Sequence, residues 1–204
     1  MDDERVMVFI DGNNLYHELK GHFGRSDMDF AKFCRKLAGD RALVRTYYYN
    51  APVDKSREPD RHARQENFFR SLQRLPYFEL RLGRLVYFEW PRQSPIEKGV
   101  DVRLSTVMVV HAFRNSYDTA ILVSGDTDYS AALQAVKDQG KHVEVALFSG
   151  RHRQELPRRL LGRRCRPQAV ASCYPLTTPI GRIRHTFFAI LAPSRTSTTT
   201  ATSL

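Results

Sequence analysis

Acidic residues stand at the ends of short apolar runs in this chain. Asp11 follows Val6–Ile10, and Asp126 and Asp128 follow Ala120–Val123. Short, fully apolar runs are typical of central parallel strands, which are buried on both faces. The carboxyl ends of parallel strands share one edge of the sheet, where open α/β folds bind their ligands. The sequence therefore predicts an α/β fold in which these carboxylates meet at one edge.

Alternating strand and helix patterns indicate one domain with a layered architecture. Runs rich in apolar, β-branched or aromatic residues predict strands at 6–10, 42–49, 78–88, 120–123 and 142–148. Apolar residues at helical spacing predict helices at 13–20, 29–37, 58–75, 100–113 and 129–138. Strands separated by helices favour a parallel sheet with right-handed crossovers. We expect a three-layer α/β/α domain with a central, mainly parallel sheet over residues 5–150.

The positive charge of the chain lies almost wholly in its last quarter. The net charge is +10, and residues 149–204 contain ten Arg, no Lys and one Glu. Low-complexity composition and the absence of a regular pattern predict an irregular or disordered tail over 151–204. Such a tail either contacts phosphates without sequence preference or is simply solvated. A shifted reading frame near residue 150 would also account for ten Arg without a Lys.

Targeting signals are not evident. The N-terminus is acidic over Met1–Glu4, where a signal peptide would be basic, and there is no run of about 18 apolar residues. Cys34, Cys165 and Cys173 show no metal-ligand spacing and suit a reducing compartment. We expect a cytoplasmic protein without a membrane span.

The acidic residues define a candidate metal site. Its four members are Asp11, Asp101, Asp126 and Asp128. Like charges at close range need compensation, and carboxylate oxygens suit the hard cations Mg²⁺ and Mn²⁺. A bound cation of this kind activates water and neutralises charge when a phosphodiester is hydrolysed. These residues therefore predict a metal-dependent enzyme that acts on phosphate, with the four acids as both metal ligands and catalytic groups.

Polar residues beside these acids are candidates for substrate binding or for positioning the carboxylates. They are Asn14, Lys98, Ser124 and Thr127. Each acid alone has a plainer interpretation as a helix cap or as a first-turn residue. Three such caps at adjacent strand ends are less expected than one site. Residues 47–49 are three tyrosines, which either stack RNA bases or, more often for a strand, pack in the core.

Four motifs in order resemble the NYN domain of the LabA-like (DUF88) group, within the PIN-like nuclease superfamily. The resemblance covers residues 5–148 and rests on Val8-Phe9-Ile10-Asp11-Gly12-Asn13-Asn14-Leu15, Lys98-Gly99-Val100-Asp101-Val102, Ile121-Leu122-Val123-Ser124-Gly125-Asp126-Thr127-Asp128-Tyr129 and Gly140-Lys141-His142-Val143-Glu144-Val145. It implies a Mg²⁺- or Mn²⁺-dependent ribonuclease with an acidic pocket at the C-terminal edge of the sheet. RNA is the implied partner, and a homodimer is a possible assembly.

Two departures from the family pattern keep other functions open. Val107 stands where the family usually has a further Asp, and the family's last helix and strand have no clear counterpart after residue 150. A regulatory RNA-binding module that has lost catalytic power is therefore the alternative. A phosphatase resembling the haloacid dehalogenases, with Asp11 as nucleophile, ranks lower because Asn13 stands where that chemistry needs a second acid.

Overall fold

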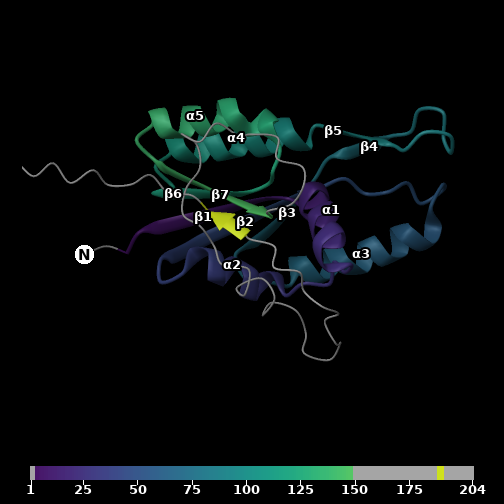
Figure 1. The fold of residues 1–204 in the computed structure, drawn as a ribbon, viewed down its shortest axis with the longest axis horizontal. Coiled ribbons are helices and arrows are strands. Elements are labelled where there is room, and N and C mark those ends of the chain that lie inside the picture. The colour runs from purple at the N-terminus through teal and green to yellow at the C-terminus, as the bar shows by residue number, and fades with distance from the viewer. Residues whose placement is uncertain (1–2, 149–187, 191–204) are drawn as a thin grey trace, which may run out of the picture.

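Strand β1(Arg5–Asp11) lies at the centre of a six-stranded sheet in the computed structural model, which describes residues 3–148 and 188–190 (Figure 1). The elements that follow are α1(Gly12–Phe23), α2(Phe30–Ala38), β2(Ala42–Asn50), α3(Pro59–Gln73), β3(Phe78–Leu82), β4(Arg84–Val86), β5(Ile96–Lys98), α4(Val100–Phe113), β6(Thr119–Val123), the 3₁₀ helix η1(Thr127–Tyr129), α5(Ser130–Asp138), β7(His142–Phe148) and β8(Phe188–Ile190).

The sheet has the strand order β3-β2-β1-β6-β7-β8. Its first five strands are parallel, and β8 is antiparallel to β7. Helices α1, α2 and α3 lie on one side of the sheet, and α4 and α5 lie on the other (Figure 1). The prediction of a three-layer α/β/α domain with a mainly parallel sheet is confirmed. Because the chain leaves β1 toward β2 but leaves β6 toward β7, the connections diverge between these central strands, which is where such sheets bind ligands.

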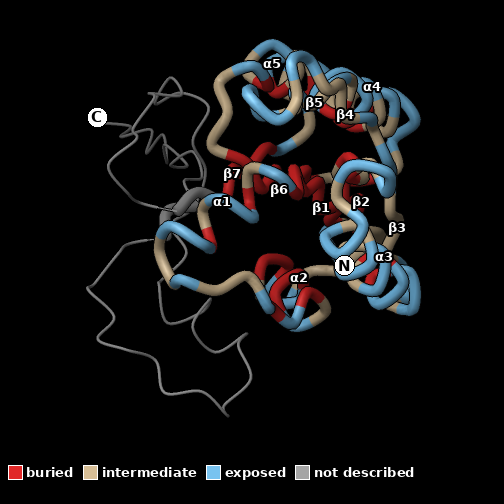
Figure 2. Tube along the Cα trace, turned by 90° about the vertical axis from the view of Figure 1, so that its right-hand side faces the viewer, coloured by how far each residue is buried: buried red, intermediate tan, exposed pale blue. Residues whose placement is uncertain are grey.

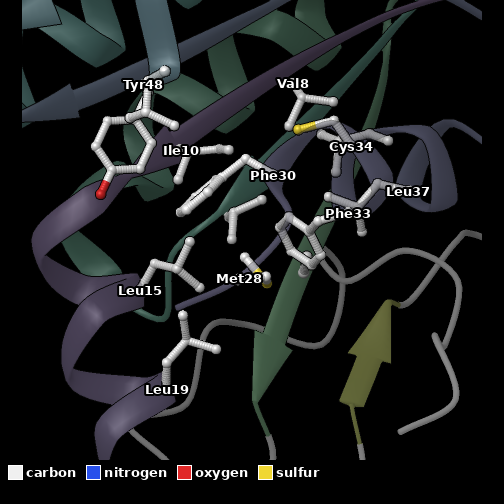
Figure 3. Packing of buried hydrophobic residues seen from close by; sticks show 14 of the residues in the cluster. Val8, Ile10, Leu15, Leu19, Met28, Phe30, Phe33, Cys34, Leu37 and Tyr48 are labelled. Carbon is white, nitrogen blue, oxygen red and sulfur yellow. The ribbon is translucent and has the colours of Figure 1, made fainter. Parts of the chain in front are cut away.

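The alternation of side chains along β1 builds a core on each face of the sheet. Val8 and Ile10 join the cluster packed against α1 and α2, where Figure 3 shows them with Phe30. Met7 and Phe9 join the cluster on the side of α4 and α5. Successive side chains of a strand point to opposite faces, so a strand buried on both faces is apolar throughout. Figure 2 shows the result, buried central strands between helices whose outer surfaces are exposed.

The structure corrects the prediction of a single strand over 78–88. β3 ends at Leu82, and β4 instead pairs antiparallel with β5 in a separate hairpin that leads into α4 (Figure 1). A Cβ atom on Gly83 would lie 2.6 Å from Val100 Cγ2 and 3.1 Å from the Lys98 carbonyl oxygen. The chain can therefore change direction at Gly83 because this residue lets the start of α4 approach its backbone closely.

The predicted tail lies mostly outside the described residues. One short piece of it, β8, is described and adds an antiparallel edge strand beside β7. The suggestion of a shifted reading frame and two of the cysteines, Cys165 and Cys173, also fall outside. Within the part of the chain that the structure describes, every helix is too short or too polar to cross a membrane.

Candidate acidic site

Asp11 ends β1 and is 8% exposed. Its Oδ1 accepts a hydrogen bond from the Asn14 backbone N–H at 3.0 Å, which caps α1. Its Oδ2 accepts one from the Tyr129 hydroxyl at 3.0 Å. Burial raises the pKa of Asp11, the two hydrogen bonds lower it, and the nearby Asp126 carboxylate raises it again. A buried carboxylate beside a second one is a group that gains from a cation.

Asp126 is held at the end of β6 by a local network. Its backbone N–H donates to Ser124 Oγ at 3.2 Å, and its Oδ1 accepts from the Asp128 backbone N–H at 3.0 Å. Asn14 joins this loop to α1, because its Oδ1 accepts from the Gly125 N–H at 3.0 Å. Ser124 and Asn14 therefore use these oxygens to position the Asp126 loop beside the N-terminus of α1.

Asp101 and Glu97 bring two further carboxylates from the β5–α4 corner. Asp101 lies in the first turn of α4, as the sequence predicts, and it is exposed. Glu97 is partly buried, and its Oε1 accepts no hydrogen bond. Burial, together with the charges of Asp11 and Asp101, raises the pKa of Glu97 to about 7, although a hydrogen bond from the Asn13 side chain acts in the opposite direction. We call Asp11, Glu97, Asp101 and Asp126 the acidic site.

Tyr129 links the members of the acidic site. It is 1% exposed and comes from η1, beyond the Asp126 loop. Burial raises the pKa of its hydroxyl, and Asp11, Asp101 and Asp126 all raise it as well. The hydroxyl is therefore protonated at neutral pH and is a fixed donor to Asp11. The hydrogen bond from Tyr129 to Asp11 joins segments 118 residues apart, and the charges of Asp101 and Asp126 also act on this phenol.

The remaining predicted residues lie at the margin of the acidic site. Asp128 is exposed in the middle of η1, and Thr127, the first residue of η1, is partly exposed beside it. Lys98 is exposed and pairs with Arg84 across the hairpin. Because side chains alternate along a strand, Lys98 and Glu97 point to opposite faces of the hairpin, and Glu97 is the one coupled to the acids.

Val107 lies in apolar packing on α4. It is partly buried against the core cluster on the α4 side of the sheet. Six residues after Asp101, it lies about 120° away from that residue around the helix axis. The same cluster contains Tyr129, which donates to Asp11.

Two residues of this region were not predicted from the sequence. Tyr129 directly follows the Asp126 motif, and this position in the sequence is a signal from which its contact with the site could have been predicted. Glu97 precedes Lys98 on a strand of three residues whose outer positions, Ile96 and Lys98, are exposed. Its weak pattern gives no sign that this strand exists.

The donor set of the acidic site fits a hard divalent cation, although no cage is preformed. Among residues 3–148 and 188–190, no three His, Cys, Asp or Glu side chains are gathered closely enough to hold a metal ion. Mg²⁺ commonly takes only one or two carboxylates and completes its shell with waters and substrate phosphates. The Glu97 oxygen that lacks a partner and the crowded charges around Asp11 are consistent with such a ligand.

Fold and site together define an α/β domain with acidic side chains at the C-terminal edge of its parallel sheet. A comparison with protein-family models matches the NYN domain over residues 5–163, and the chain therefore belongs to the NYN family. NYN domains have the PIN-like nuclease fold, are generally nucleases and act on RNA. The match extends beyond residue 150, where we placed the end of the domain.

A solved structure supports the fold. The chain is similar to the crystal structure of a protein of unknown function from Vibrio parahaemolyticus, with 23% sequence identity and a TM-score of 0.54. The similarity covers 70% of this chain and 80% of that one. No functionally curated protein matches the chain.

Proposed function

We propose that this protein is a Mg²⁺- or Mn²⁺-dependent ribonuclease of the LabA-like group that hydrolyses RNA phosphodiester bonds at the acidic site. The observation that carries the proposal is the convergence of Asp11, Glu97, Asp101 and Asp126 from three segments of the chain, the end of β1, the β5–α4 corner and the loop after β6. Placing a buried carboxylate and a partly buried one close to two others is unfavourable for folding, and a bound cation would offset this repulsion. Membership of the NYN family supplies the reaction class.

The residues present can share the work of hydrolysis. Asp11 and Asp126 are the principal candidates to hold a cation, with Glu97 and Asp101 completing the shell directly or through water, and Asp128 at the margin. When bound, the cation supplies a water made nucleophilic and neutralises the developing phosphate charge. Tyr129 holds Asp11 in one orientation through its hydrogen bond.

The predicted substrate-binding residues take different parts in this proposal. Asn14 and Ser124 keep the Asp126 loop in place through the hydrogen bonds of their side-chain oxygens. Thr127 and Lys98 are accessible at the margin and would contact the RNA backbone, Lys98 as a point charge on a phosphate.

A regulatory RNA-binding module is the alternative that one observation favours. Within the described residues no three potential ligands form a preassembled metal group. A domain that binds RNA at this edge without cutting it would keep the fold and lose only the metal. The phosphatase alternative gains nothing, because Asn13 is exposed beside Glu97 and supplies no second acid.

The test is cleavage of single-stranded and structured RNAs by the purified full chain in Mn²⁺, in Mg²⁺ and in EDTA. Asp11→Asn and Asp126→Asn each keep a side chain that caps a helix, so the fold should persist while the negative charge is lost. We expect cleavage only with the metal, and a loss of at least about 100-fold in each variant. The matched control is Asp40→Asn. Asp40 is an exposed acid beside the start of β2, so it lies at the opposite edge of the sheet from the acidic site.

Undiminished cleavage by both site variants would reject the proposed site. RNA binding without cleavage under either cation would instead place the protein in the binding class.

A further inference from the structure

One stretch of the sheet on the α4 side is bordered by arginines rather than by apolar residues. β3 is an edge strand, and its Glu79 and Arg81 stand beside Tyr47 and Tyr49 of β2. The side chains of Arg45, Glu79 and Arg81 are 39%, 28% and 54% exposed, so α4 does not cover this edge. Their exposure distinguishes this edge from the apolar packing around β1 and β6.

Four arginines lie around this edge of the sheet. Glu79 forms ion pairs with both Arg45 and Arg81. Arg103 and Arg114 approach from α4, Arg103 by donating to the Leu82 carbonyl oxygen at 2.6 Å and Arg114 through its charge near Tyr47 and His111. We call Arg45, Arg81, Arg103 and Arg114 the arginine face. Glu79 is the acid that pairs with these arginines among the described residues, so the net charge of the five side chains is about +3.

The tyrosines of this region are part of the core and leave the cations as the accessible groups. Tyr47 is 4% exposed and exchanges a hydrogen bond of 2.9 Å with His111 Nε2, and Tyr48 is 3% exposed. Base stacking on these tyrosines, one of the two interpretations of residues 47–49, is therefore wrong for the folded protein. Recognition by guanidinium groups alone would depend on phosphate and not on base identity.

The arginine face reaches the acidic site at Tyr49. In the register of the sheet, Tyr49 is the partner of Asp11. Its hydroxyl is buried, accepts and donates no hydrogen bond, and has Arg81 and Arg103 nearby. An unpaired hydroxyl donor beside two cations is a place where an anionic oxygen would be favoured. From Tyr49 back to Arg45 the strand extends about 13 Å along β2.

We propose that the arginine face binds the phosphodiester backbone of RNA and delivers the strand to the acidic site. The acidic site itself repels phosphate, so a neighbouring surface must hold the RNA there. Charge complementarity selects a polyanion as the occupant, and the arginine-rich residues 149–204 of this chain would be repelled. Delivery of the RNA to the acidic site rests on the proposed function, whereas binding of RNA to the arginine face does not.

The test measures binding in EDTA, where no cleavage can occur. A 5′-labelled 12-nucleotide oligouridylate is titrated with the full chain and followed by fluorescence anisotropy at several salt concentrations. Arg81→Gln/Arg114→Gln should weaken binding about tenfold at low salt and reduce the slope of log K against log salt by about 1.4, since each phosphate contact on a single strand contributes about 0.7. The tail is present in every variant, so its own contribution cancels.

Matched variants separate charge from fold. Arg81→Lys/Arg114→Lys should restore both affinity and salt slope. Glu79→Gln should strengthen binding because it removes the carboxylate that pairs with Arg45 and Arg81. Arg61→Gln/Arg70→Gln, two exposed arginines of α3 on the other side of the sheet, should have no effect. Arg114→Gln alone leaves the ion pairs of Glu79 intact. If the double variant unfolds, this single variant should still show weaker RNA binding.

The outcomes are distinguishable from those of the proposed function. If Arg81→Gln/Arg114→Gln weakens RNA binding, leaves kcat unchanged and raises KM for long RNA, the result supports both the nuclease and the arginine face. Weaker binding in a protein that never cleaves supports the arginine face and rejects the nuclease. Unchanged affinity and salt slope, an equal loss in the α3 control, or the same affinity for an acidic peptide as for RNA would overturn the arginine face.

Discussion

Glu97 lies partly buried beside Asp11 and Asp101, and its pKa is about 7 against an ordinary value of 4.5. A carboxyl group whose pKa is higher in the folded chain than in the unfolded chain favours folding while it is protonated. That contribution is complete below about pH 4.5 and is lost as the pH rises through about 7. In the metal-free protein, Glu97 should therefore lower stability most at neutral and alkaline pH.

We predict that Glu97→Gln raises the thermal unfolding midpoint of the metal-free protein at pH 8 and changes it little at pH 5. Glutamine is neutral at both pH values, so it removes the cost of the buried charge. Scanning calorimetry in EDTA from pH 5 to 8 measures the difference, with Glu66→Gln on the exposed face of α3 as the control. A difference between Glu97→Gln and the wild type that stays constant with pH would contradict the raised pKa.

At the scale of elements, the approach of α1 to β2 depends on Gly12. A Cβ atom on Gly12 would lie 2.4 to 2.6 Å from the ring and hydroxyl of Tyr48, which is buried among aromatic neighbours in the core. Gly12 is the first residue of α1, directly after Asp11. Displacing it would therefore move both the helix and the carboxylate that caps it.

Gly12→Ala should destabilise the protein by about 1–3 kcal/mol, the usual cost of overpacking, although alanine favours helices. Gly21→Ala is the matched control, because it lies in the same helix with no atom within 4 Å of its new Cβ. That variant should be neutral or more stable by about 0.5–1 kcal/mol. Chemical denaturation compares them, and equal effects of the two substitutions would refute the close contact with Tyr48.

Strong patterns placed most elements of the main sheet correctly, and weak patterns hid the rest. β1 and β6 are buried on both faces, so their apolar runs predict the strands correctly. The ends of these runs in turn indicate Asp11 and Asp126 as candidate site residues. The hairpin β4–β5 has three residues in each strand and exposed positions at Arg84 and Lys98. Its pairing is set by tertiary contacts at Gly83 and Val100, which local periodicity does not encode, and Glu97 was missed with it.

At the scale of the whole molecule, charge is separated between neighbouring surfaces. The acidic site gathers four carboxylates at the carboxyl ends of β1 and β6 and at the β5–α4 corner, and the arginine face follows the adjacent β2–β3 edge. A polyanion is attracted to one surface and needs a cation to approach the other. Such a pair of surfaces makes RNA binding and metal binding distinct events that can be measured separately.

Metal binding should therefore raise the thermal unfolding midpoint of the protein in the absence of RNA. A ligand that binds only the folded protein stabilises it by about 2.7 kcal/mol at 100 times its Kd. For a chain of this length about 2–4 °C accompanies each kcal/mol, so saturating Mn²⁺ should raise the unfolding midpoint by about 5–10 °C over EDTA. The Asp11→Asn/Asp126→Asn double variant should lose this rise, because it lacks the two acids proposed as the main ligands.

The comparison is informative because the double variant removes charge repulsion as well as ligands. Its metal-free midpoint should lie at or above that of the wild type, while its response to Mn²⁺ disappears. A lower metal-free midpoint would mean that the two acids act mainly as helix caps, since asparagine would then have failed to replace them. A full response to Mn²⁺ in the double variant would show that the cation binds elsewhere, and the acidic site would no longer be the proposed metal centre.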